Sequence, residues 1–161
     1  MAVVENRVLN CAEETREQGD RLIALTLSRP PVWVARALES IRRDYPQART
    51  RTSASGFSIS ALGPEGFPVS LEIDGDVFRV WFARCMHEFR DVESALKCVD
   101  FALSDRAVLK IKFIGATASE WTLGRRDSTT DKVDPLLAGG SGMRVFWQPA
   151  REEVFTNRLA S

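Results

Sequence analysis

Two alternating segments joined by a tight turn constrain the fold of this chain more than any other feature. Residues 68–74 alternate apolar and polar side chains, which is the period of a β-strand with one buried face. The Asp-Gly-Asp sequence at 74–76 favours a hairpin turn, because an Asp-Gly pair tolerates positive φ angles. Residues 77–83, VFRVWFA, are apolar on both faces except at Arg79, as is typical of a central strand. The stretch therefore predicts an antiparallel hairpin whose second strand is covered on both sides.

The same period of two recurs on either side of this hairpin. It predicts strands over 57–62 and 107–115, and a hairpin partner for the second of these with Trp121 and Leu123 on its buried side. A last clear strand is expected over 143–149. The expected chain order is therefore an antiparallel meander, then the helix at 91–103, then further strands.

Helical periods predict two helices with recognisable ends. The segment 91–103 carries a wide apolar stripe, and Asp91 is a good N-cap for it, so this helix is expected to lie on the sheet. The segment 31–45 carries a second stripe. It begins at prolines that suit a first helical turn and is stopped by Pro46.

The fold class that follows is α+β: one antiparallel sheet of about five to seven strands, with helix 91–103 packed on one face. The other face also needs a cover, because the strand at 77–83 is apolar on both sides. The N-terminal helices are candidates for that cover, and a second copy of the chain is the alternative.

A single domain over residues 1–161 is expected, since this length suits one hydrophobic core. It comprises a helical N-terminal region, 1–46, and a region of sheet plus helix, 57–149. The pattern leaves open whether 20–28 and the closing segment 150–161 are helix or strand.

Composition narrows the function classes. The chain is 44% hydrophobic and 27% charged, with 22 basic and 22 acidic residues. Proteins that bind nucleic acids or membrane surfaces usually carry an excess of basic residues, so the balanced charge argues against both functions. No apolar stretch approaches the roughly 18 residues of a membrane span. The N-terminus has neither the basic region nor the long apolar region of a signal peptide. Three cysteines, Cys11, Cys85 and Cys98, show no paired spacing, so reduced thiols in a cytoplasmic protein are expected.

The segment 84–89, RCMHEF, contains the only histidine of the chain, near a cysteine and a glutamate, and is a candidate site. Cys85 and His87 are two residues apart on an extended chain, roughly 6.6 Å at ~3.3 Å per residue, which is poor geometry for a nucleophile and its base. His87 with Glu88 and Asp91 offers too few ligands for zinc, and Asp91 has a better role as a helix cap. The preferred interpretation is the end of a strand, so no catalytic residue, metal or cofactor is expected.

Two other segments invite a functional interpretation. AGGSG at 138–142 lacks the lysine and the helix of a phosphate loop, so a flexible connection is expected there. Arg125 and Arg126 begin a polar stretch, 125–134, whose aspartates neutralise them, which predicts a solvated loop. The small polar stretch 48–56 is interpreted as a linker.

The four tryptophans are the remaining candidates for binding. Trp81, Trp121 and Trp147 each fall on a predicted strand, where a core role is favoured over a ligand pocket or a base-stacking surface. Trp33 lies beside the apolar stripe of its helix, where exposure would suggest a partner.

Two function hypotheses remain. The preferred one is a non-catalytic protein-interaction or regulatory module that associates with itself as a homodimer or with another protein. The alternative is a small-molecule-binding protein, or an enzyme, with a pocket near Trp81, Arg84 and His87, where an arginine and an aromatic lie close to the histidine. Neither nucleic acid nor membrane is expected as a partner.

Overall fold

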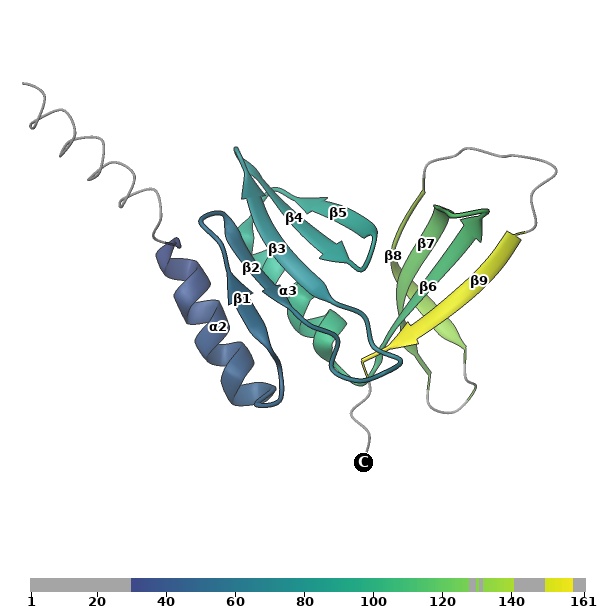
Figure 1. The fold of residues 1–161 in the computed structure, drawn as a ribbon, viewed down its shortest axis with the longest axis horizontal. Helices are drawn as coiled ribbons and strands as arrows, with labels where there is room; N and C mark the ends of the chain where they lie inside the picture. The colour runs from purple at the N-terminus through teal and green to yellow at the C-terminus, as the bar shows by residue number, and fades with distance from the viewer. Residues whose placement is uncertain (1–29, 128–129, 131, 141–149, 158–161) are drawn as a thin grey trace, which may run out of the picture.

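Two antiparallel sheets and two helices make up the described chain (Figure 1). The computed structural model describes residues 30–127, 130, 132–140 and 150–157. Its elements, in chain order, are α2 (Val32–Asp44), β1 (Thr50–Thr52), β2 (Gly56–Ile59), β3 (Val69–Asp74), β4 (Val77–Phe82), β5 (Cys85–Phe89), α3 (Val92–Leu103), β6 (Ala107–Ile114), β7 (Thr117–Arg126), β8 (Val133–Gly140) and β9 (Ala150–Thr156).

The first sheet is a meander of five strands in the order β1-β2-β3-β4-β5. The hairpin predicted at 68–83 is confirmed as β3 and β4, and Gly75 in its turn has a positive φ of 62°. The cross-strand register places the apolar side chains of alternate positions on one face of this sheet. This inner face includes the buried side chains of Phe57, Ile59, Val69, Leu71, Val80, Phe82 and Cys85.

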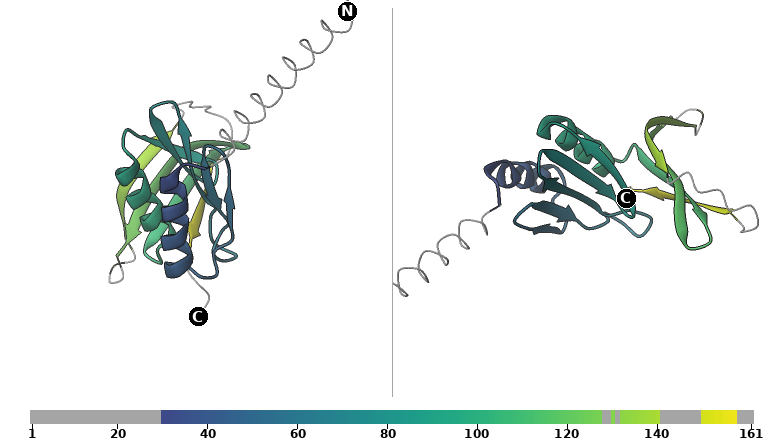
Figure 2. Two further views of the ribbon diagram at one scale, coloured as in Figure 1. Left: turned by 90° about the vertical axis from the view of Figure 1, so that its left-hand side faces the viewer. Right: turned by 90° about the horizontal axis from the view of Figure 1, so that it is seen from above.

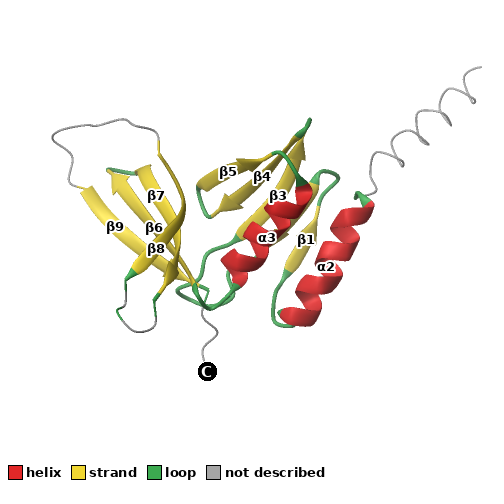
Figure 3. Cartoon of the chain, turned by 180° about the vertical axis from the view of Figure 1, so that it is seen from behind, coloured by secondary structure: helices red, strands yellow, loops and turns green. Residues whose placement is uncertain are grey.

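Both helices lie on this inner face (Figure 3). Trp33 of α2 contacts Phe57 and Phe78 edge-on or tilted, with ring centroids 6.2 and 6.0 Å away. The predicted helix at 91–103 is confirmed as α3, and its Asp91 side chain accepts a hydrogen bond of 2.7 Å from the backbone N–H of Ser94. The prediction that the N-terminal helices cover the opposite face is wrong for α2, because the only apolar stripe of α2 is used on the same face as α3.

No described helix or sheet packs on the outer face of the first sheet. Trp81 pairs across the strands with Met86, and both side chains are half-buried. Arg79 forms ion pairs with Asp74 and Glu88 on this face. Among the described residues, β4 is therefore covered by helices on one side only, whereas its apolar pattern predicted burial on both sides.

The second sheet has four strands in the order β8-β7-β6-β9, so the prediction of one sheet is wrong. Seen from above, the two sheets lie side by side rather than stacked (Figure 2). One face of the second sheet is apolar, with Leu109, Ile111, Phe113, Trp121 and Leu123 buried. The other face carries exposed ion pairs such as Lys112 with Glu120 at 3.4 Å.

A continuous buried cluster joins the two sheets. Trp121 of β7 contacts Phe82 of β4 at a centroid distance of 5.8 Å and His87 of β5 at 6.3 Å. Gly139 lies against the same indole, since a Cβ at this position would stand 2.6 Å from Trp121 Nε1. The inner face of the first sheet and the apolar face of the second therefore share one core.

Asn157 closes the fold from the end of β9. Its side-chain oxygen accepts a hydrogen bond of 2.9 Å from the backbone N–H of Phe67, and its Nδ2 donates one of 2.9 Å to the carbonyl of Ala102. The neighbouring Thr156 N–H donates to the carbonyl of Glu65 at 2.9 Å. The amide of Asn157 is 2% exposed, so these bonds replace its contacts with water.

Several predicted connections are strands. Residues 50–52, in the predicted linker, form β1, and residues 133–140, predicted as loop and flexible connection, form β8. The closing segment, which the sequence left open, is a strand over 150–156. The strand predicted at 143–149 and the helical region before residue 30 lie outside the described residues.

Candidate functional site

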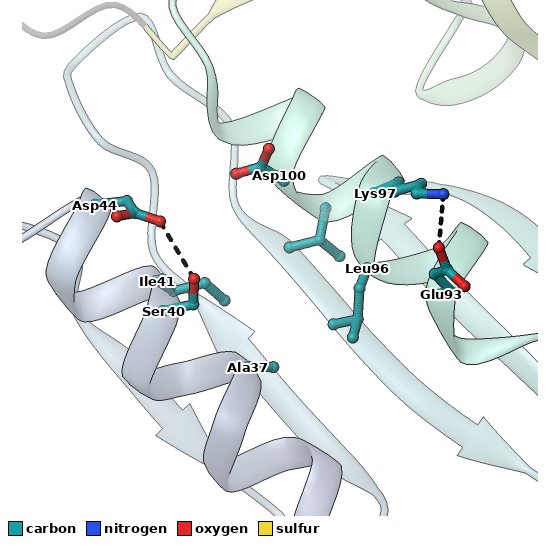
Figure 4. A pocket seen from close by; sticks show the side chains of 9 residues that line it. Ala37, Ser40, Ile41, Asp44, Glu93, Leu96, Lys97 and Asp100 are labelled. Atoms are coloured by element: carbon teal, nitrogen blue, oxygen red, sulfur yellow. Dashed lines mark hydrogen bonds and ion pairs between the residues drawn. The ribbon is translucent and has the colours of Figure 1, made fainter.

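A groove lies between α2 and α3 and is lined by described residues of both helices (Figure 4). Its volume is about 280 Å³. Its lining comes from both helices: Ala37, Ser40, Ile41 and Asp44 of α2, and Glu93, Leu96, Lys97, Val99 and Asp100 of α3. We refer to it below as the α2–α3 groove.

The groove exists because small side chains stand where the two helices face each other. Ala37 and Ser40 are one helical turn apart on α2 and reach little beyond the backbone. Across from them, Leu96 of α3 is half-buried, and the larger apolar residues of both helices point down to the sheet. Apolar surface is therefore left open to solvent between the helices.

The floor of the groove is apolar and its rim is charged. Ile41 and Val99 are buried beneath it. On the rim, Lys97 forms an ion pair with Glu93 at 2.8 Å, one turn apart on α3. Asp44 accepts a hydrogen bond of 3.2 Å from the hydroxyl of Ser40. An apolar strip between polar edges is the arrangement that receives the apolar face of another helix.

Tyr45 joins the C-terminal ends of the two helices beside the groove. Its hydroxyl donates a hydrogen bond of 3.4 Å to the backbone carbonyl of Asp100. Burial raises the pKa of Tyr45 to about 12, and the negative charges of Asp100 and Asp44 add to this effect. The phenol therefore stays neutral and serves as a fixed bridge between α2 and α3.

His87, the centre of the predicted site, lies on the inner face of β5. Its ring is half-buried and packs edge-on against Phe89, at a centroid distance of 4.9 Å, and against Trp121 at 6.3 Å. Because Trp121 belongs to the second sheet, the imidazole contributes to the contact between the sheets. No described interaction links His87 to a carboxylate.

The structure does not bring the three predicted ligand-binding residues together. Trp81 and His87 lie on opposite faces of the first sheet, because their registered partners are Met86 and Val80, respectively. Arg84 is exposed in the turn between β4 and β5, next to Ala83, whose φ is 53°. A pocket that uses all three side chains would need a different arrangement of this hairpin.

The described thiols are buried rather than activated. Desolvation raises the pKa of Cys85 to about 11 and that of Cys98 to about 12. Thiols of this kind are protonated at neutral pH and pack as small apolar groups. Within the described ranges, no group of three or more His, Cys, Asp and Glu side chains is placed to hold a metal ion.

The other segments considered from the sequence have structural positions. Residues 138–140 of the glycine-rich segment are the end of β8, and 141–142 lie outside the described residues. Arg125 and Arg126 are the last residues of β7 rather than part of a loop. Trp33 is partly buried against the first sheet, and Trp147 lies outside the described residues.

The α2–α3 groove was not found from the sequence. Its residues lie on two helices separated by the whole first sheet, and each helix shows an ordinary apolar stripe when considered by itself. The available signal was the pair of small residues, Ala37 and Ser40, next to the stripe of α2.

No described helix has the length and apolar character needed to cross a bilayer. Comparisons of the chain with models of protein families, with characterised proteins and with solved structures returned no match.

Proposed function

We propose that this protein is a non-catalytic interaction module that binds a helical segment of another polypeptide in the α2–α3 groove. The observation that carries the proposal is the open apolar strip between α2 and α3, whose buried apolar side chains pack on the sheet. A helix that binds in such a strip buries apolar surface, and each Å² of buried apolar surface contributes about 25 cal/mol to the free energy of binding. This burial is the usual source of affinity when a helix binds in a groove.

The chemistry of the described reactive side chains supports binding rather than catalysis. The thiols of Cys85 and Cys98 are held protonated by burial. The imidazole of His87 is packed between aromatic rings rather than against a nucleophile. Neither arrangement provides the short contact between nucleophile and base that covalent catalysis uses.

A neutral helical peptide tests the proposal. We suggest a peptide of about 15 residues with leucines at i, i+4 and i+7 and with Ala, Gln and Ser elsewhere, long enough for roughly four helical turns. We expect micromolar binding in fluorescence anisotropy, with amide chemical-shift changes confined to α2 and α3. The Leu96→Gln variant should weaken binding about tenfold by removing apolar contact.

The matched control is Val154→Gln, the same type of change at a residue 47% exposed on the second sheet. It should leave peptide affinity unchanged. Binding that ignores Leu96→Gln, or shift changes that map away from both helices, would contradict the proposal.

Self-association is a second form of the same function. Trp81 and Met86 leave apolar surface on the outer face of the first sheet, where no described element packs. As the protein concentration increases, we expect the mass measured by light scattering to rise towards about twice that of one chain, as for a two-fold symmetric dimer. Trp81→Ser should return it to that of one chain, and a single-chain mass at every concentration would exclude this form.

A small-molecule binder is the alternative function. The groove volume of 280 Å³ lies close to the lower end of the range for ligand pockets, about 300–1,000 Å³. A thermal-shift screen, followed by Leu96→Gln and His87→Ala, would locate any ligand found. Affinity lost with His87→Ala, and not with Leu96→Gln, would place the ligand at the histidine instead of the groove.

A further inference from the structure

We infer that the α2–α3 groove selects a helix that carries lysine or arginine beside its apolar face, with a cation seated near Asp44 and Asp100. The inference rests on the proposed function and specifies the chemistry of the partner. It follows from the distribution of charge along the rim of the groove.

The rim carries an excess of negative charge. Three carboxylates, Asp44, Glu93 and Asp100, line the groove together with a single ammonium group, Lys97. Lys97 is already paired with Glu93 at 2.8 Å, so this pair is close to neutral. The other two carboxylates of the lining are those of Asp44 and Asp100, and Asp100 is the one with no ion pair among the described residues.

The two aspartates differ in their existing partners. Asp44 shares its carboxylate with the exposed guanidinium of Arg43 at 3.1 Å, an ion pair at the surface, where screening by water keeps such pairs weak. The carboxylate of Asp100 has no ion pair within the described residues. A cation on a docked helix would therefore gain its strongest new contact at Asp100.

The helix ends add to the negative potential at this position. Asp44 is the last residue of α2, and Asp100 lies in the last turn of α3. Carbonyl groups at the C-terminal end of a helix carry partial negative charge that favours cations. Tyr45 bonds to the carbonyl of Asp100 beside these groups, and its pKa is raised first by burial and then by the charges of Asp100 and Asp44. That contribution reflects the same field that a docked cation would meet.

The apolar and charged parts of the groove match different parts of one ligand. Leu96, which is half-buried, provides the open apolar surface beside the nearly buried Ala37, and the aspartates stand at one end of that surface (Figure 4). A helix with acidic flanks would bring like charges together at Asp100. The charge pattern therefore favours basic over acidic amphipathic helices, because specificity depends on the difference between the two affinities.

The test uses the full-length protein and two charged forms of the neutral peptide. In one form the glutamines beside the apolar face are replaced by lysines, and in the other by glutamates. At low salt we expect the lysine peptide to bind about tenfold more tightly than the glutamate peptide, and this difference to shrink as salt rises. The Asp100→Asn variant should remove most of the difference in affinity between the two charged peptides.

Glu72→Gln is the matched control, because it removes one exposed carboxylate on the outer face of the first sheet. It should preserve the preference for the lysine peptide. Equal affinity for both charged peptides, or a preference that survives Asp100→Asn, would overturn this inference. The inference would also be overturned if Leu96→Gln left the affinity for the lysine peptide unchanged. The peptide would then bind through charge alone and not in the α2–α3 groove.

The outcomes separate this inference from the proposed function. If the neutral peptide binds and Leu96→Gln weakens it, the proposed function stands whatever the charged peptides do. If the neutral peptide does not bind in the groove, the proposed function fails and the selectivity inferred from it fails with it.

Discussion

Asn157 is a buried amide that connects three distant parts of the chain. It bonds to the backbone of Phe67 and of Ala102, one 90 and the other 55 residues away in sequence. A Cβ at Gly66 would stand 2.5 Å from its side-chain oxygen, so the glycine leaves room for the amide. A polar group with this degree of burial is stabilising only while both bonds are intact.

We expect Asn157→Ala to lower the free energy of unfolding by about 2–3 kcal/mol, because the N–H of Phe67 and the carbonyl of Ala102 would lose their partners in a buried site. Urea denaturation followed by tryptophan fluorescence measures this loss. Ser58→Ala, at an exposed position of β2, is the control and should change stability by less than about 0.5 kcal/mol. A loss for Asn157→Ala no larger than the control would contradict this account.

Asp91, at the N-terminal end of α3, makes the stability of the fold depend on pH. Asp91 caps the helix, and the backbone N–H of Ser94, followed by its hydroxyl, lowers the pKa of the aspartate below its ordinary 3.8. A lowered pKa means that the carboxylate stabilises the fold above pH 3.8. This contribution is lost as pH falls through the folded-state value.

The Asp91→Asn variant isolates this effect, since asparagine also caps helices but does not titrate. We expect the wild-type protein to lose stability relative to this variant as pH falls below 3.8. Above about pH 5, the stability of the two proteins should depend on pH in the same way. Thermal unfolding across this range is the measurement. Parallel pH profiles for the two proteins would show that the carboxylate does not contribute through its charge.

Elements with a strong period could be predicted from the sequence, and those without one could not. The stripe and cap of α3, and the alternation in β3, β4 and β6, identify these segments by local pattern. β1 has only Thr-Arg-Thr, and β8 contains Pro135 and Gly139 with no apolar alternation. Their strand structure comes from pairing with a neighbour, which a local period does not encode.

Gly139 shows why one of these segments was misinterpreted. Two consecutive glycines suggest a flexible connection, but here the missing side chain of Gly139 makes room for the indole of Trp121 on the adjacent strand. The relevant property of this glycine is its small size rather than its freedom of rotation.

At the scale of the whole molecule, one core serves two sheets. Trp121 is 8% exposed and contacts both Phe82 and His87 of the first sheet. The sequence predicted burial of Trp121 but not the split into two sheets, because alternation shows which face is apolar and not which strands pair. The candidate site depends on the same level of organisation, since two helices far apart in sequence form the α2–α3 groove.

We expect Trp121→Ala to reduce stability by about 3–5 kcal/mol and to affect both sheets equally, because a cavity would open where they meet. Native-state hydrogen exchange at the amides of β3 and β6 is the measurement. Trp81→Ala, on the face where no described element packs, should cost less. Loss of protection in β6 with none in β3 would show that the sheets unfold as separate units.

Residues near the end of the described chain complete contacts with its middle. Thr156 and Asn157 bond to the loop at 65–67, and β9 supplies one edge of the second sheet. During synthesis, then, roughly the first 150 residues would leave the ribosome before these bonds can form, and contacts so distant in sequence slow the search for the native state. Over that interval, the edge of β6 that pairs with β9 would carry unpaired backbone N–H and C=O groups, and such an open edge favours aggregation of the nascent chain.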